Sequence, residues 1–165
     1  MDVLLKPPIK SQIKQPRTIF ILIATTLFIM ARCGGSRVQC QKMLSTVNQG
    51  YALIHAKQDR YDADTTQQLA TELEATATQI ESIKMSDRQL KIMQTQFATV
   101  YRELSQTLAE IGTTLKTGEQ APITLKGRQQ LVSAREQLLT VGSSANQTGK
   151  NVDALMNEIN QYCPQ

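Results

Sequence analysis

The chain has 165 residues, three cysteines, no tryptophan and a formal net charge of +4, a length that suits one domain plus a short targeting segment. The excess charge lies in residues 1–33, where five basic residues accompany one acidic residue, while residues 34–165 carry thirteen of each. Because nucleic-acid binding depends on clustered lysine and arginine, this balance argues against a nucleic-acid-binding protein. We expect a signal or targeting segment at 1–33 and a single helical domain at 34–165.

Residues 1–33 have the layout of an export signal. A basic stretch that ends at Arg17 precedes the uncharged run TIFILIATTLFIMA at 18–31, which is the order of segments in a secretory signal. This run is shorter than the roughly 20 apolar residues that a membrane-spanning helix needs. The sequence therefore predicts export, either to the periplasm after cleavage near Cys33 or Gly35, or with the uncleaved segment as a single-pass membrane anchor.

The end of this segment carries a cysteine-containing box. The residues MARC at 30–33, followed by GGS at 34–36, resemble the signal region of bacterial lipoproteins, in which a short box ends in cysteine. That family prefers leucine at the first box position and a small residue before the cysteine, where this chain has Met30 and Arg32. The resemblance implies lipidation of Cys33. The glutamine- and threonine-rich composition is also similar to that of small exported cyanobacterial proteins.

Residues 34–165 have apolar side chains at helical spacing and few aromatic residues, which favours helices over strands. The spacing predicts four amphipathic helices, at 37–58, 65–85, 87–117 and 122–162. Their predicted apolar seams are Cys40, Leu44, Val47, Tyr51 and Ile54; Leu69, Leu73, Ala77, Ile80 and Ile83; Leu90, Met93, Phe97, Val100, Leu104, Leu108, Ile111 and Leu115; and Leu131, Leu138, Leu139, Val152, Leu155, Met156 and Ile159.

Capping signals set the predicted boundaries of these helices. Thr65 with Gln68, and Ser86 with Gln89, have the spacing of capping boxes, in which a hydroxyl caps the helix start. The segment KTGEQAP at 116–122 is the strongest loop signal, because glycine can end a helix and proline can begin one. We therefore expect tight links between neighbouring helices.

The last predicted helix contains a segment of ambiguous composition. Residues 140–151, TVGSSANQTGKN, favour a loop by propensity. However, Gly142, Ala145 and Gly149 continue the apolar spacing toward Val152, and small residues let a helix approach its neighbour closely. We expect a continuous or kinked helix here, with a true break as the alternative.

These elements predict an all-α fold, an elongated antiparallel four-helix bundle with up-down-up-down order, in which the third and fourth helices project past the first two. In that order the first helix starts where the fourth ends. Cys40 and Cys163 lie at these two positions, and exported proteins keep disulfides. We therefore predict a Cys40–Cys163 disulfide; the alternative is that Cys40 is a buried core residue and Cys163 belongs to a frayed end.

The sequence contains no arrangement typical of catalysis. His55 is the single histidine, and no cysteine or histidine stands at zinc-ligand spacing from it. We expect no enzyme activity, metal or cofactor, and interpret the chain as an exported bundle that acts through an unknown protein partner in the cell envelope. Contact would be made by the polar faces of the third and fourth helices or by residues 116–122. The alternative is a carrier of a small apolar ligand or cofactor between the helices.

Overall fold

The computed structural model describes residues 17–57 and 62–163, with side chains from Ser36 onward. It contains α1 (Arg17–Ala56), α2 (Ala63–Ser82), α3 (Arg88–Glu119) and α4 (Leu125–Tyr162) and no strand in the described ranges. Contacts between Cα atoms divide the chain into Met1–Gly35 and Ser36–Gln165. The packing described below is that of the second unit, which we call the body.

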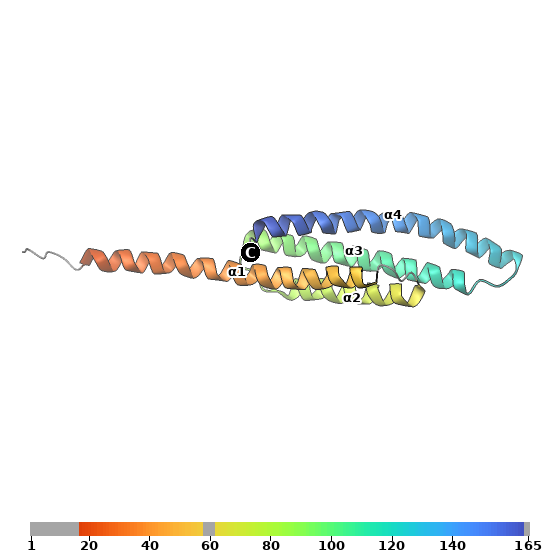
Figure 1. The fold of residues 1–165 in the computed structure, drawn as a ribbon, viewed down its shortest axis with the longest axis horizontal. Coiled ribbons are helices and arrows are strands. Elements are labelled where there is room, and N and C mark those ends of the chain that lie inside the picture. Colours follow the sequence, from red (N-terminus) through yellow and green to blue (C-terminus); the bar gives the residue numbers. More distant parts are fainter. Residues whose placement is uncertain (1–16, 58–61, 164–165) are drawn as a thin grey trace, which may run out of the picture. The chain divides into compact units, whose positions relative to one another are not determined.

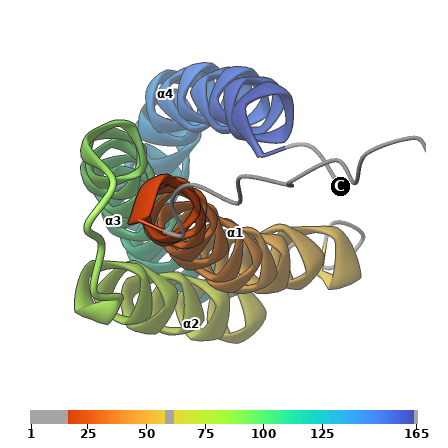
Figure 2. The ribbon, with the colours of Figure 1, turned by 90° about the vertical axis from the view of Figure 1, so that its left-hand side faces the viewer.

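Consecutive helices of the body run in opposite directions (Figure 1). α3 packs against both α2 and α4, and Figure 2 shows these two helices on different sides of α3. At the end away from the C-terminus, α3 and α4 extend past α1 and α2 (Figure 1). The predicted all-α, up-down-up-down bundle with its projecting helix pair is therefore confirmed.

The core forms one cluster in which the predicted seams of α2 and α3 meet α1. All five predicted seam residues of α2 are buried, and Phe97 and Leu90 of α3 are 0% exposed. On α1 the predicted Cys40 and Val47 are buried, but between them Met43 is fully buried while the predicted Leu44 is only partly buried. The largest fully buried side chains are Tyr101, Phe97, Met43, Leu73, Ile80, Leu90, Met93, Ile159 and Val47.

A glycine sets the close approach of α1 to α3. A Cβ atom added to Gly50 would lie 2.8 Å from Cζ of Tyr101, so only glycine leaves room for the ring. The Tyr101 hydroxyl donates a hydrogen bond of 2.8 Å to the Val47 carbonyl oxygen. Burial raises the pKa of Tyr101 above its usual value. The neutral phenol therefore ties the two helices together inside the core.

Replacing Tyr101 by phenylalanine is expected to lower the free energy of unfolding by about 1 kcal/mol, the usual net contribution of one hydrogen bond. The ring stays, so the loss isolates the hydroxyl that bonds to Val47. Urea titration followed by circular dichroism measures it. Tyr51→Phe is the control, because Tyr51 is only partly buried. An equal loss in both variants would contradict the assignment.

α4 runs without interruption from Leu125 to Tyr162, which confirms the continuous-helix prediction and excludes the break. The prediction that the glycines let α4 approach a neighbouring helix closely was wrong, because a Cβ added to Gly142 or Gly149 would meet no atom within 4 Å. The buried residues of α4 include the predicted Val152 and Ile159, together with smaller residues that were not predicted: Gly127, Ala134, Val141 and Thr148.

α1 begins well before the predicted start at residue 37. Its backbone is helical through Gly34 and Gly35. Each glycine costs a helix about 1 kcal/mol relative to alanine, and no proline lies between residues 17 and 56. Two glycines within a long helical stretch are therefore not enough to end it.

Aspartates, not the predicted hydroxyl residues, cap α2 and α3. Asp62 accepts a hydrogen bond of 2.8 Å from the Thr65 N–H, so the predicted cap Thr65 lies inside α2. In the same way Asp87 accepts from the N–H groups of Gln89 and Leu90, both at 2.9 Å. Aspartate and serine are comparable caps, so a sequence that offers both leaves the start of the helix ambiguous by a few residues.

α4 begins at Leu125 and not at Pro122 as predicted, because Thr124 caps it with a hydrogen bond of 3.1 Å from the Gly127 N–H. A Cβ atom on Gly127 would overlap the Pro122 carbonyl group. The glycine is therefore required by the tight turn from Pro122 into the helix. Gly118, the predicted helix end, lies inside α3.

Candidate functional site: the disulfide end of the bundle

Cys40 and Cys163 form a disulfide that joins the body's first helix to the end of its last. Their Cα atoms are 5.7 Å apart, across a sequence separation of 123, within the normal range for such bonds. Both residues are buried, and the Cys163 N–H donates a hydrogen bond of 2.8 Å to the Ile159 carbonyl oxygen. The predicted pairing is confirmed, and the frayed-end alternative was wrong.

Gln39, the neighbour of Cys40, fastens α1 to the link between α2 and α3. Its Oε1 atom accepts hydrogen bonds from the N–H groups of Ser86, at 2.9 Å, and Asp87, at 3.3 Å. Its Nε2 atom donates to the Ser86 Oγ at 2.7 Å. Ser86, the predicted cap of α3, therefore bonds to Gln39 of α1 instead. No local sequence pattern indicates this role.

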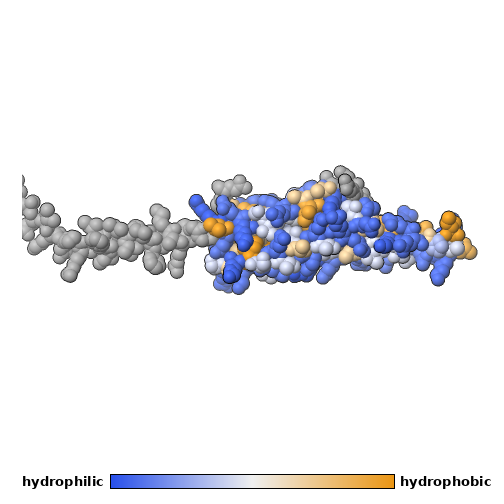
Figure 3. All heavy atoms as spheres, turned by 90° about the horizontal axis from the view of Figure 1, so that it is seen from below, coloured by the Kyte–Doolittle hydropathy of each residue, from blue (hydrophilic) through white to orange (hydrophobic). Residues whose placement is uncertain are grey.

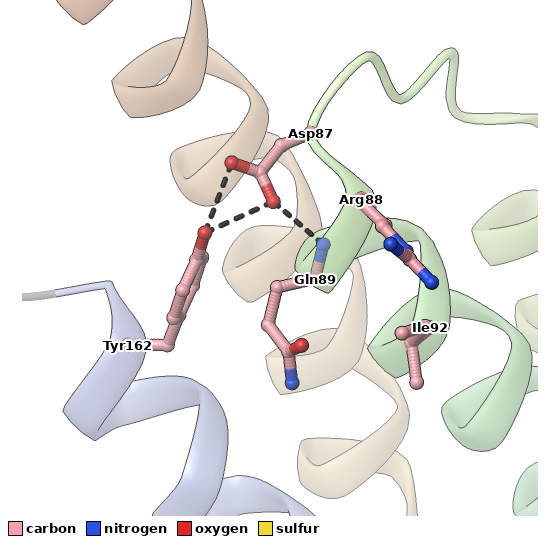
Figure 4. Close-up of a pocket in the computed structure, with 5 residues that line it drawn as sticks. All are labelled: Asp87, Arg88, Gln89, Ile92 and Tyr162. Carbon is pink, nitrogen blue, oxygen red and sulfur yellow. Dashed lines mark hydrogen bonds between the residues drawn. The ribbon is translucent and has the colours of Figure 1, made fainter.

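Asp87 and Tyr162 bring the start of α3 and the end of α4 together (Figure 4), and Tyr162 immediately precedes Cys163 of the disulfide. The Tyr162 hydroxyl lies 3.0 Å and 2.9 Å from the two carboxylate oxygens of Asp87, to which it donates. Hydrogen bonds from the Leu90 N–H, Tyr162 and the Gln89 N–H lower the pKa of Asp87. The same contact raises the pKa of Tyr162, because the neutral phenol is the donor.

The lowered pKa of Asp87 predicts acid sensitivity of this end. A carboxylate with a lowered folded pKa stabilises the fold above its unfolded pKa of about 3.9, and this stabilisation disappears as the pH falls through the folded value. We expect the melting temperature of the wild type to fall more steeply than that of Asp87→Asn between about pH 5 and pH 2. Asparagine keeps a capping oxygen but has no charge to lose.

Thermal melts by circular dichroism across this pH range measure the difference. Asp153→Asn, which changes an exposed residue of α4, is the matched control and should follow the wild type. Parallel pH profiles for wild type and Asp87→Asn would contradict the proposed stabilisation by the carboxylate.

A hollow of about 510 Å³ opens next to this pair, lined by Asp87, Arg88, Gln89, Ile92 and Tyr162. Figure 4 shows these side chains at the start of α3 and the end of α4. Ile92 and Tyr162 are 45% and 39% exposed, so an apolar side chain, a phenol and charged groups reach one surface. Such a surface can recognise another molecule through mixed polar and apolar contacts.

A second hollow, also of about 510 Å³, lies between α2 and α3. It is lined mostly by small and polar side chains: Gln67, Ala70, Thr71, Glu74, Ala75, Thr78, Ser105 and Ala109. The Ser105 hydroxyl donates a hydrogen bond of 2.7 Å to the Ala70 carbonyl oxygen, which fixes the floor of the hollow. We call this feature the α2–α3 groove. Its small side chains would let a partner's backbone or side chains approach both helices.

Arg102 binds two glutamates of α2, one of which, Glu74, lines the α2–α3 groove. Its Nε lies 3.1 Å from Glu74 Oε1 and its Nη2 lies 3.0 Å from Glu81 Oε2. Hydrogen bonds from Arg102 lower the pKa of Glu81, and the two glutamates raise that of Arg102. All three side chains are partly exposed, so the network aligns the helices more than it stabilises them.

Cys33 and His55 are the remaining residues that were suggested for a site or considered as a ligand from the sequence. The proposed lipidation site Cys33 and the apolar run at 18–31 lie outside the residues whose side chains are described. The His55 ring contacts that of Tyr51 in a tilted arrangement, with ring centroids 4.4 Å apart. Within the described part of the chain, no group of three or more histidine, cysteine or acidic residues is placed to hold a metal ion.

Within the same described residues, no helix has both the length and the apolar character needed to cross a membrane.

The fold and the site define a disulfide-linked, antiparallel four-helix bundle. No protein-family model matches the chain, and no curated protein or solved structure matches it significantly. Its function is therefore inferred from its own residues.

Proposed function

We propose that the chain is an exported protein of the cell envelope, membrane-tethered or periplasmic, that acts by binding another protein and not as an enzyme. The observation that carries this proposal is the Cys40–Cys163 disulfide. Such bonds persist in oxidising compartments outside the cytoplasm. The layout of residues 1–33, a basic stretch followed by an apolar run, supports the same compartment.

Cys33 would tether the protein after lipidation. Each buried CH₂ group of an acyl chain contributes about 0.8 kcal/mol to membrane binding, and Cys33 is distinct from the two cysteines of the disulfide. The three cysteines would then divide into one for attachment and two for stability. An uncleaved apolar segment at 18–31 is the alternative means of attachment.

The α2–α3 groove and the polar hollow beside Tyr162 are the proposed protein-binding surfaces. Both are walled by fixed helices, and protein interfaces combine apolar contact with polar groups at their rim. The alternative of a ligand carrier has less support, because the cluster between the helices is filled with side chains that pack against one another.

Fractionation with a radioactive or clickable acyl label tests export and tethering together, using the wild type and Cys33→Ser. The proposal predicts wild-type protein in the envelope and an acyl label that Cys33→Ser lacks. Membrane-bound protein without label in either variant would identify the uncleaved segment as the anchor, and unlabelled protein in the soluble periplasmic fraction would identify the cleaved form. Wild-type protein in the cytoplasmic fraction, with reduced cysteines, would contradict the proposal.

Site-specific photocrosslinking in cells tests the proposed protein partner. A photoreactive residue at Thr71, in the α2–α3 groove, should give one discrete crosslinked product. The same residue at Lys150, an exposed position on α4, is the matched control and should give none. Absence of a product at Thr71 and also at Gln89, in the other hollow, would count against both surfaces.

A further inference from the structure

The link between α3 and α4 carries apolar side chains that contact little of the body. Ile123 is 106% exposed and Leu125 is 82% exposed. Both lie at the projecting end of the helix pair, opposite the disulfide end (Figure 1). Orange apolar atoms gather at this right-hand end in Figure 3. Large apolar side chains that are exposed to solvent at the tip of a protein indicate a surface that binds another molecule.

The exposed apolar surface continues along the outer side of α4. Leu125, Val132 and Leu139 are 82%, 54% and 69% exposed and are spaced by seven residues, so they lie on one helix face. Ala134 and Val141, which are buried, come two positions after Val132 and Leu139. Two positions are more than half a turn of an α-helix, so the buried residues face away from the exposed ones. The exposed stripe is therefore separate from the core. We call Ile123, Leu125, Val132 and Leu139 the tip face.

The tip face lies in a segment with an excess of basic residues. Residues 116–139 contain four basic and two acidic residues, a net charge of +2, whereas the rest of residues 34–165 has nine basic and eleven acidic residues, a net charge of −2. The basic side chains are Lys116, Lys126, Arg128 and Arg135. The ion pairs within the described residues involve Lys57 and Arg102 instead. The four charges at this end are therefore available to an external anion.

We propose that the tip face binds an anionic lipid surface. Interfacial binding combines buried apolar area with attraction of lysine and arginine to anionic headgroups. In this arrangement Ile123 and Leu125 enter the boundary between headgroups and acyl chains. The side chains of Arg128 and Arg135 flank the stripe on α4 and are long enough to keep their charges among the phosphates.

The shape of this face favours lipid over a folded protein partner. The most exposed members, Ile123 and Leu125, project from a turn and a helix start, whereas the α2–α3 groove and the hollow beside Tyr162 are lined by other residues. A bilayer surface accommodates projecting side chains without a matching pocket. The proposal concerns the body alone and does not depend on how residues 1–33 are processed.

Tryptophan fluorescence offers a local test, because the chain has no tryptophan. In full-length Leu125→Trp, the single indole reports contact at the tip even where the apolar run at 18–31 also binds vesicles. We expect a blue-shifted emission and quenching by brominated acyl chains in phosphatidylglycerol vesicles, with little quenching in phosphatidylcholine vesicles. Adding Arg128→Glu and Arg135→Glu should weaken the anionic-vesicle response at least tenfold, because each basic residue near the surface contributes roughly fivefold.

Ala75→Trp, on the exposed side of α2 at the groove, is the matched control and should not be quenched. Ile123→Asp in the Leu125→Trp background should abolish quenching while the helical circular dichroism spectrum stays unchanged. An indole that stays unquenched in the Leu125→Trp variant with anionic vesicles would overturn the proposal. A blue shift that grows with protein concentration without lipid would assign the face to a second copy of the chain and would overturn it as well.

Discussion

Replacing both Cys40 and Cys163 by serine is expected to lower the free energy of unfolding by about 4 kcal/mol. The bond closes a loop with a sequence separation of 123, and in the chain-entropy model a loop of about 100 residues is worth about 4.7 kcal/mol. Both thiols are replaced so that neither remains free to form other disulfides. Urea unfolding followed by circular dichroism measures the change.

Chemical reduction of the wild type is the first control, and it should reproduce the loss seen in the double variant. Cys33→Ser is the second, because Cys33 takes no part in the disulfide, and it should unfold like the wild type. A double variant as stable as the wild type would show that packing and the Gln39 and Tyr162 contacts alone hold this end together.

Replacing Gln94 by leucine is expected to lower the free energy of unfolding by about 2 kcal/mol. Gln94 is 7% exposed, and its Nε2 atom lies 2.6 Å from the Ile80 carbonyl oxygen and 2.7 Å from that of Ile83. These carbonyls lie at the end of α2, where no further helical turn follows. The Ile80 oxygen also accepts from the Ile83 N–H at 3.2 Å, so leucine would leave the buried Ile83 oxygen without its donor, which costs about 1–3 kcal/mol.

Urea unfolding also measures this loss, and Gln106→Leu is the matched control, because Gln106 is exposed on the same helix. The control should change stability by less than about 0.5 kcal/mol. Equal effects of the two substitutions would mean that the capping of α2 by Gln94 contributes nothing to stability.

The spacing of apolar residues predicted the fold, because burial of whole helix faces is the main interaction that holds the bundle together. Leu69, Leu73 and Ile80 have the spacing of one face, and all are buried. On α4 the same method failed in detail. Leu131 and Leu139, which are 50% and 69% exposed, were assigned to the seam because they are apolar, whereas smaller residues such as Ala134 form the buried face.

The polar contacts of the site could not be predicted from sequence. Gln39 and Gln94 bond to groups 47 and 14 residues away, so their roles depend on tertiary packing and leave no local pattern. The disulfide could be predicted, because helix order alone places Cys40 and Cys163 at one end. The contact of Tyr162 with Asp87 could not be predicted in the same way. It depends on the rotation of α4 about its axis as well as on the disulfide.

The disulfide also determines how the body would respond to mechanical tension. Cys40 and Cys163 are joined at one end of the bundle. A load applied between the segment before Cys40 and the chain after Cys163 therefore passes through a covalent bond. The residues between the two cysteines, which include all of α2 and α3, bear none of that load. Pulling in this direction would leave the helical residues between the two cysteines folded until the sulfur–sulfur bond is reduced.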